Sequence, residues 1–174
     1  DWATFTANPA RFRIGAFDCL SGEHVYWGRD DIGSLRDLMV RVRASSTMPV
    51  IMPPVHIGDR VYVDGALGPS GGIPLDAAQA DGFDRFLVVL TQKRDYVKKP
   101  VGQEWFYRRH FREYPAVADA LRRRSDAYNA TREELFALER AGKAYLFVPE
   151  VMPIGNGERD LARLRTTFRL GADQ

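Results

Sequence analysis

Residues 86–90 read Phe-Leu-Val-Val-Leu, an apolar run that no polar residue interrupts. A strand that is covered on one face alternates apolar and polar residues, whereas an unbroken apolar run indicates a strand covered on both faces of a sheet. Gly82 precedes the run, and a charged connector at 93–100 follows it. These residues therefore predict the buried strand of an α/β domain.

Two hairpins are predicted before this strand. Polar and apolar residues alternate over 11–17, a Ser-Gly-Glu turn stands at 21–23, and a second strand-like stretch covers 24–27. Gly and Asp at 58–59 have the composition of a hairpin turn that leads into a strand at 60–63. Each hairpin signal is local, because both strands and their turn are adjacent in the sequence.

Helical periodicity predicts most of the remaining elements. Apolar residues from Leu35 to Val42 fall at i, i+3, i+4 and i+7, and Asp30 or Asp31 is placed to cap the free N–H groups of this helix. Residues 131–134 have the capping-box pattern that starts a helix. The predicted helices cover about 31–43, Pro74 to the residue before Gly82, about 115–128, 131 to the residue before Gly142, and about 158–170.

Strands and helices that alternate in this manner imply α/β layers around a mainly parallel sheet. A further short strand is predicted at 144–149, between the last two helices. The chain has 174 residues, of which 45% are hydrophobic, so it can bury one sizeable core and is too short for two unrelated domains. We expect a single α/β domain.

Charge and cysteine content argue against several classes of protein. The 25 basic and 23 acidic residues are mixed along the chain and give a formal net charge of +2, so no strong attraction to nucleic acid is expected. Cys19 is the single cysteine and cannot form an internal disulfide, and His24, His56 and His110 lack the spacing of a zinc site. No apolar run approaches the roughly 18 residues of a membrane span. We therefore expect a cytoplasmic protein without a metal or another cofactor.

The clearest chemical signal is carried by residues 61–66, Val-Tyr-Val-Asp-Gly-Ala. Asp64 stands where a strand ends and a glycine-rich loop begins, a position that holds a carboxylate rigidly at a crevice. Strand-end aspartates also accept backbone N–H groups and hold the following loop in place. By itself the segment leaves both interpretations open.

Short motifs in a fixed order extend this signal over nearly the whole chain. They are Phe-Asp-Cys-Leu-Ser-Gly-Glu at 17–23, Arg-Ala-Ser-Ser-Thr-Met-Pro at 43–49, Tyr-Val-Asp-Gly-Ala at 62–66, Ile-Pro at 73–74 with Val-Val-Leu-Thr at 88–91, and Tyr-Pro at 114–115 with Tyr-Asn at 128–129. In this order they resemble the bacterial branch of the patatin-like phospholipases. The motif at 62–66 resembles the Asp-Gly-Gly/Ala motif that carries the catalytic aspartate of that family.

The resemblance implies a three-layer α/β/α patatin-like fold, incomplete in this chain, in which residues 1–100 are the C-terminal part of the catalytic domain and residues 101–174 its helical C-terminal extension. It also implies a lipid acyl hydrolase with a Ser-Asp dyad, in which Asp64 is the general base. The family's nucleophilic serine and oxyanion-hole glycines lie before the region matched here. The N-terminal half of the same protein is therefore expected to supply them, and residues 1–174 alone are expected to be nearly inactive.

Residues 68–72, Gly-Pro-Ser-Gly-Gly, also fit the pattern Gly-x-Ser-x-Gly. A nucleophile elbow places its serine in a tight turn between a strand and a helix that begins immediately. Here the predicted strand ends at Val63 and the next helix starts near Pro74, and the family places its serine before its aspartate. We expect Ser70 to belong to a loop rather than to act as the nucleophile.

Other conspicuous residues have structural interpretations beside functional ones. By resemblance Ser45 and Ser46 line the acyl pocket, although they fit the capping of a helix end equally well. No catalytic role is expected for the three histidines. The arginines at 122–124 point in different directions on a helix and predict a solvated face. Residues 105–109, Trp-Phe-Tyr-Arg-Arg, predict packed aromatic rings, with contact to a membrane surface as the alternative.

The expected partners follow from these predictions. They are a lipid or another acyl-ester substrate and, transiently, a membrane surface, whereas nucleic acid is not expected. The alternative function is a non-catalytic patatin-fold module that binds a lipid or a partner through its helical C-terminal part. An upstream region without Gly-x-Ser-x-Gly would favour this alternative.

Overall fold

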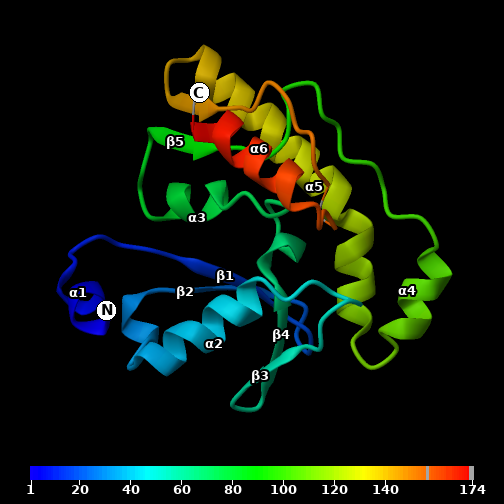
Figure 1. The fold of residues 1–174 in the computed structure, drawn as a ribbon. Coiled ribbons are helices and arrows are strands. Elements are labelled where there is room, and N and C mark those ends of the chain that lie inside the picture. Colours follow the sequence, from blue (N-terminus) through cyan, green and yellow to red (C-terminus); the bar gives the residue numbers. More distant parts are fainter. Residues whose placement is uncertain (156, 173–174) are drawn as a thin grey trace. The chain divides into compact units, whose positions relative to one another are not determined.

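The computed structural model describes residues 1–155 and 157–172 (Figure 1). The chain divides into two compact units, Asp1–Phe83 with Lys98–Arg132, and Asp84–Val97 with Glu133–Gln174. Each has helices and strands, so the fold is of the mixed α/β class. The expected division into residues 1–100 and 101–174 concerns the parts of a patatin-like domain and stays a prediction, and residues 156, 173 and 174 of its second range lie outside the described residues.

The first unit holds most of the secondary structure. Helix α5 contributes its residues up to 132 to this unit and its remaining residues to the second unit. The elements of the first unit are α1 (Trp2–Ala7), β1 (Ile14–Asp18), β2 (His24–Trp27), the 3-10 helix η1 (Arg29–Asp31), α2 (Leu35–Ser45), β3 (Val55–Ile57), β4 (Arg60–Asp64), the 3-10 helix η2 (Gly65–Leu67), α3 (Leu75–Ala80), α4 (Glu104–His110) and the first part of α5 (Pro115–Arg140). Those of the second unit are β5 (Phe86–Val89), the last turns of α5, β6 (Ala144–Phe147) and α6 (Leu161–Ala172).

The sheet of the first unit has the strand order β2-β1-β4-β3, and every neighbouring pair in it is antiparallel. Both predicted hairpins are confirmed as β1–β2 and β3–β4. The prediction of a mainly parallel sheet is wrong for these strands, because short turns join neighbours within each hairpin and a short turn can only reverse the chain. Among the described residues, the parallel pair is β5–β6 in the second unit.

Helices cover both faces of the four-stranded sheet. On one face Phe17 and Val63 pack with Val117 and Leu121 of α5 in a buried apolar cluster. On the other face Ala44, at the end of α2, is buried with residues of β1, β2, β3 and β4. Figure 1 shows α2 lying along this sheet. Residues of a strand point alternately to the two faces, which explains how β1 and β4 supply both clusters.

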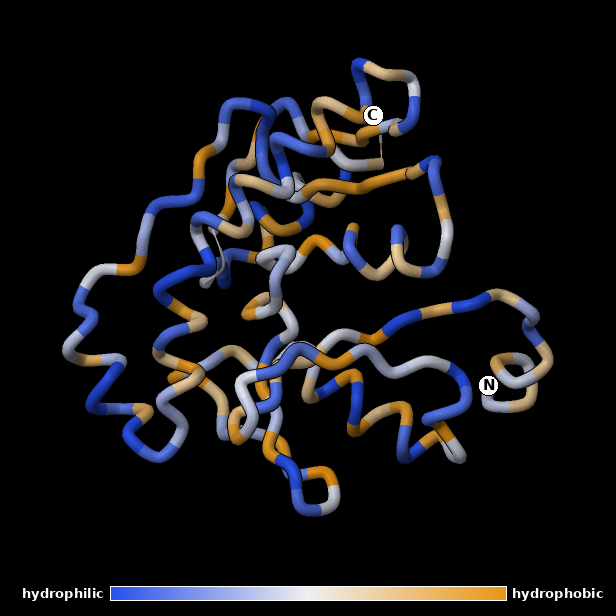
Figure 2. Tube along the Cα trace, turned by 180° about the vertical axis from the view of Figure 1, so that it is seen from behind, coloured by the Kyte–Doolittle hydropathy of each residue, from blue (hydrophilic) through white to orange (hydrophobic). Residues whose placement is uncertain are grey.

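Helix α2 forms as predicted, and hydrophobic and hydrophilic residues alternate along its turns in Figure 2. Three of the apolar residues that predict it are exposed, since Leu35 is 50%, Met39 64% and Val42 48% exposed, and Val40 and Ala44 pack on the core instead. The cap of α2 differs from the predicted Asp30 or Asp31. Ser34 precedes the helix, and its hydroxyl accepts the N–H of Asp37 at 3.1 Å. Asp31 instead accepts the N–H of Gly28 at 2.8 Å and closes η1, so the chain forms a separate 3-10 turn before α2 begins.

Helix α5 is continuous from Pro115 to Arg140, so the prediction of two helices in series is wrong. Thr131 has the letters of a capping residue but is buried within the helix. The side chain of Asn129 binds the backbone of Lys98, accepting its N–H at 2.9 Å and donating to its C=O at 3.0 Å. Asn129 therefore has a partner outside the helical backbone, and the helix ends as predicted, just before Gly142.

The second unit contains the predicted apolar strand at 86–90. Strand β5 forms at Phe86–Val89, pairs with β6, and is an unbroken hydrophobic stretch in Figure 2. Cover on both faces was expected, but Leu87 is 75% exposed and Val89 is 67% exposed. Burial therefore alternates along this strand even though its composition does not.

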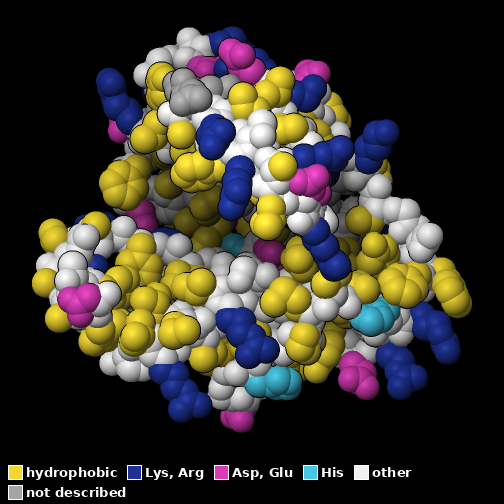
Figure 3. Space-filling view, in the orientation of Figure 1, with side chains coloured by type: hydrophobic (Ala, Val, Ile, Leu, Met, Phe, Trp, Pro, Cys, Tyr) yellow, Lys and Arg dark blue, Asp and Glu magenta, His cyan; other side chains and the backbone are white. Residues whose placement is uncertain are grey.

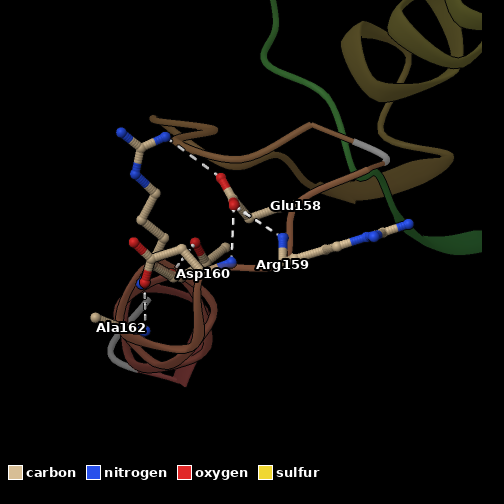
Figure 4. A network of polar contacts seen from close by, with 6 residues as sticks. Glu158, Arg159, Asp160 and Ala162 are labelled. Carbon is tan, nitrogen blue, oxygen red and sulfur yellow. Dashed lines mark hydrogen bonds and ion pairs between the residues drawn. The ribbon is translucent and has the colours of Figure 1, made fainter.

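Helix α6 lies close to its predicted range and has a defined start. Oε1 of Glu158 accepts the N–H of Asp160 at 2.9 Å, and Oδ1 of Asp160 accepts the N–H of Ala162 at 2.8 Å (Figure 4). Acceptors at these positions satisfy the N–H groups that the first turn of a helix leaves unpaired. The local sequence therefore explains where α6 begins.

Candidate active site

Asp64 is the last residue of β4 and pairs with Ala16 of β1 in the sheet register. The half-buried carboxylate lines a cavity of about 380 Å³ in the first unit. The structure brings several predicted residues to this cavity, since Ser45, Ser46 and Ser70 line it as well. Residues from the first hairpin, the end of α2 and the loop before α3 thus meet around one carboxylate.

The two oxygens of the Asp64 carboxylate have different surroundings. Oδ1 accepts the N–H of Ala66 at 2.8 Å and so holds the start of η2. Oδ2 has no hydrogen-bond partner among the described residues. Burial raises the pKa of Asp64, while the N–H of Ala66 and the positive charge of Arg124 act in the opposite direction. The hydrogen bond that holds the loop thus occupies one oxygen and leaves the other available to accept a proton.

Gly65 fixes the position of Asp64 against the neighbouring strand. A Cβ atom at residue 65 would collide with the carbonyl group of Gly15 in β1. The Asp-Gly step therefore lets the backbone turn into η2 while β1 passes close by. This is a physical reason for glycine directly after the aspartate.

Ser70 lies in the loop between η2 and α3, as predicted, and no strand-to-helix elbow is formed there. The residue is only 7% exposed, and its hydroxyl donates to Oδ1 of Asp76 at 2.6 Å. The same oxygen accepts the hydroxyl of Tyr26 at 2.8 Å. Gly71 has a φ of +64°, and a Cβ there would collide with the backbone of Tyr128. Close packing thus explains glycine at 71 without an elbow.

His24 is the residue of this site that sequence reasoning missed. Its ring lines the cavity and packs edge-on against Tyr26, with the ring centroids 4.4 Å apart. Both ring nitrogens are buried and lack a hydrogen-bond partner within the part of the chain that the structure describes. Burial lowers the pKa of His24, while the charge of Asp76 and the nearby backbone of Gly65, which lies too far or at too poor an angle for a hydrogen bond, act in the opposite direction. An isolated histidine in a hairpin carries no local signal of such surroundings.

The remaining candidates divide between the cavity and other places. Ser46 caps α2, because its hydroxyl donates to the C=O of Val42 at 2.9 Å, and it also lines the cavity, while its role in an acyl pocket stays a prediction. His56 is exposed on β3, and His110 stacks on Phe106 at the end of α4. Neither histidine lines the Asp64 cavity.

The arginines at 122–124 fulfil the prediction of a solvated face only in part. Arg122 and Arg123 are exposed, but Arg124 is half-buried and close enough to Asp64 to influence its pKa. The prediction of packed aromatic rings at 105–107 is wrong for Trp105, which is 74% exposed. Tyr107 of the same helix packs against the buried cluster on β1, β4 and α5.

Groups of three or more His, Cys, Asp or Glu side chains that could hold a metal are absent from residues 1–155 and 157–172. Cys19 is buried, and burial raises the pKa of its thiol to about 12.

No helix in the described part of the chain is long and apolar enough to cross a membrane. On the face shown in Figure 3, Lys and Arg side chains are scattered among hydrophobic and acidic ones rather than gathered into one patch.

Residues 114–174 match a family model described as "Domain of unknown function (DUF6363)". The matched residues include α5, β6 and α6 but not Asp64 or the loop that contains Ser70. No curated protein matches the chain. The comparisons therefore concern the helical C-terminal part and leave the function of the Asp64 cavity to be argued from its chemistry.

Proposed function

We propose that the full-length protein is a patatin-like lipid acyl hydrolase in which Asp64 is the general base of a Ser-Asp dyad. The observation that carries the proposal is the carboxylate of Asp64, which lines a cavity with one oxygen held by the N–H of Ala66 and the other without a partner among the described residues. A general base needs both properties, a fixed position and a free lone pair. The serine of the dyad is proposed to lie in the part of the polypeptide that precedes Asp1.

The electrostatics of Asp64 support the role of a base. Burial raises its pKa, and a carboxylate with a raised pKa is a stronger base when it is ionised. The charge of Arg124 acts in the opposite direction and favours the ionised form that can take a proton. In the proposed reaction the free Oδ2 accepts the serine proton as the serine oxygen attacks the acyl carbon.

The lining of the cavity supports an acyl ester as substrate. Apolar side chains of Ile14, Val42 and Ile73 stand beside the hydroxyl groups of Ser45 and Ser46. Ligand sites are commonly apolar with a few polar groups that fix orientation, which suits an acyl chain and its ester. The acyl chain is therefore proposed to lie on the apolar residues, with the ester at Asp64.

The fold supports the patatin-like assignment in two respects. The four-stranded sheet has α2 on one face and α5 on the other, as a layered α/β/α arrangement requires. The parallel pair β5–β6 leaves Leu87, Val89 and Tyr145 exposed, although parallel strands are normally covered on both faces. We propose that further elements of a three-layer patatin-like domain, supplied by the N-terminal half, cover these residues.

Helix α4 supports a transient contact with the lipid surface that holds the substrate. Trp105 is exposed, and Arg109 and Arg112 are exposed close to it. An exposed indole with neighbouring arginines suits the interface between water and lipid headgroups. The proposed setting is cytoplasmic, with this helix touching the membrane during catalysis.

The test compares two strand-end aspartates. Asp64→Asn should reduce kcat for p-nitrophenyl esters or phospholipids by about 100- to 10,000-fold in the full-length protein, because the base is lost. Asp18 ends β1, accepts the N–H of Leu20 at 2.8 Å and forms an ion pair of 3.3 Å with Arg60, so Asp18→Asn is the matched control. The control should lose about 1–3 kcal/mol of stability and keep its kcat. An Asp64→Asn protein that retains full activity would exclude the proposed base.

A further inference from the structure

A second cavity of about 370 Å³ lies in the first unit, between the β1–β2 turn, the residues after η2, and α5. Its apolar lining includes Phe17, Leu67 and Ala120. Its charged lining consists of Arg123 and Arg124. None of the described residues that line it carries a carboxylate. The cavity therefore combines apolar walls with two positive charges, and the described residues that line it contribute no negative charge.

The two arginines have no counter-ion in the structure. The side chains of Arg123 and Arg124 form no ion pair or hydrogen bond with another described residue. The Nε atom of Arg124 is buried and has no partner in the part of the chain that the structure describes. Buried arginine atoms are nearly always hydrogen-bonded, since removing a guanidinium from water is unfavourable unless an acceptor replaces the water. An acceptor from outside the described residues would satisfy this group.

Lys98 adds to the positive potential near Arg124. Its Nζ atom lies 5.0 Å from the ring centroid of Tyr128, and its backbone is held on α5 by Asn129. Burial and the charge of Arg124 both lower the pKa of Lys98, which places the two cations within electrostatic range. The charge of Asp64 offsets Arg124 only at a distance, because no ion pair joins them. Bound negative charge would relieve the repulsion between the cations.

We infer that this second cavity binds an anionic amphiphile, with its phosphate or carboxylate group on Arg123 and Arg124 and its apolar part against Phe17, Leu67 and Ala120. The planar guanidinium can donate two parallel hydrogen bonds to such an oxyanion. The apolar walls favour a molecule with a hydrocarbon segment over a free inorganic ion. His24 lines this cavity and the Asp64 cavity alike, so the two sites are neighbours.

The inference goes beyond the proposed hydrolase and is tested by binding instead of activity. Calorimetric titration of the full-length protein with dodecyl phosphate, below its micelle concentration, should show saturable binding. Arg123→Gln and Arg124→Gln should each weaken the affinity about tenfold, because each removes a charged hydrogen bond. Arg122→Gln is the matched control, since Arg122 is exposed on the same helix and does not line the cavity. It should bind as the unmodified protein does.

Three further ligands separate the sources of affinity. Dodecanol tests the hydrocarbon alone, inorganic phosphate tests the anion alone, and dodecanoate tests a carboxylate in place of the phosphate. We expect dodecanol and inorganic phosphate to bind at least tenfold more weakly than dodecyl phosphate or dodecanoate. Inorganic phosphate that binds as tightly as dodecyl phosphate would overturn the assignment to an amphiphile.

The variants also decide whether the arginines are responsible. Equal affinities of the Arg122, Arg123 and Arg124 variants would overturn the inference, whether all three bind normally or all three are weakened. Circular dichroism spectra and melting temperatures of the variants should match those of the unmodified protein, so that lost binding reports the missing charge. Asp64→Asn should retain binding, and this result keeps a failure of the hydrolase proposal distinct from a failure of the anion site.

Discussion

The hydroxyl of Ser70 donates a hydrogen bond of 2.6 Å to Oδ1 of Asp76, and the hydroxyl of Tyr26 donates to the same oxygen at 2.8 Å. One carboxylate in the first turn of α3 thus joins a loop to the strand β2. Ser70 and Asp64 line the same cavity, but no hydrogen bond links them. This arrangement gives the serine of the Gly-Pro-Ser-Gly-Gly segment a structural partner of its own.

The first prediction concerns Ser70→Ala. Loss of one hydrogen bond to a partly buried carboxylate should lower the free energy of unfolding by about 1–2 kcal/mol, measured by urea denaturation. Esterase activity of the full-length protein should stay within about threefold of normal, because the proposed nucleophile lies elsewhere. A loss of activity by 100-fold or more in a folded Ser70→Ala protein would contradict the loop assignment and place Ser70 in the reaction.

The second prediction concerns Gly65→Ala. The new Cβ would collide with the carbonyl group of Gly15, and backbone on both sides can move only by disturbing the pairing of β1 with β4. Stability should fall by about 1–3 kcal/mol, the usual range for overpacking. Gly102→Ala is the control, because no atom lies within 4 Å of its Cβ position. Equal melting temperatures of the two variants would contradict the close approach of β1 to the Asp64 turn.

The third prediction concerns the dependence of stability on pH at Asp64. Because the pKa of this carboxyl is raised in the folded protein, its contribution to stability is greatest below its unfolded pKa and is lost as the pH rises through the folded pKa. Asp64→Asn should therefore gain stability relative to the unmodified protein as the pH is raised from 4 to 7. Urea midpoints of both proteins across this range measure the effect, and a constant difference would contradict it.

The fourth prediction concerns His24, whose pKa is lowered in the folded protein, whereas that of Asp64 is raised. Burial lowers the pKa, so the neutral ring stabilises the fold above the unfolded pKa of about 6.5, and this stability is lost as the pH falls through the folded pKa. The unmodified protein should lose more stability between pH 7.5 and 5.5 than His24→Phe. His56→Gln, a change at an exposed residue, is the control, and it should alter the pH dependence less than His24→Phe does.

Elements with local signals could be predicted from the sequence. The hairpins, the amphipathic helix α2 and the strand β5 depend on neighbouring residues, and the structure contains all of them. The sequence does not predict α4, because no capping side chain marks its first turn. Gln103 precedes the helix in a left-handed conformation with a φ of 61°. The sequence predicts two helices in place of α5, because Thr131 fits a capping pattern. In the structure Thr131 is buried within one continuous helix.

The candidate site was predictable only in part for a similar reason. Asp64 was found because its strand, its aspartate and its glycine are adjacent in the sequence. His24 and Arg124 belong to β2 and α5, and only the pairing of strands and the packing of α5 on the sheet bring them to the two cavities. The antiparallel order of the sheet is likewise a property of distant residues, since β1 pairs with β4 across the intervening β2, η1, α2 and β3.

The continuity of α5 has a consequence for the C-terminal family match at residues 114–174. The first turns of that segment bury Val117 and Leu121 against Phe17 and Val63, which lie far upstream. A peptide cut at the start of the match would expose these apolar side chains to water and would be prone to associate. The segment that matches the family model therefore depends on the sheet of the first unit for the burial of its first turns.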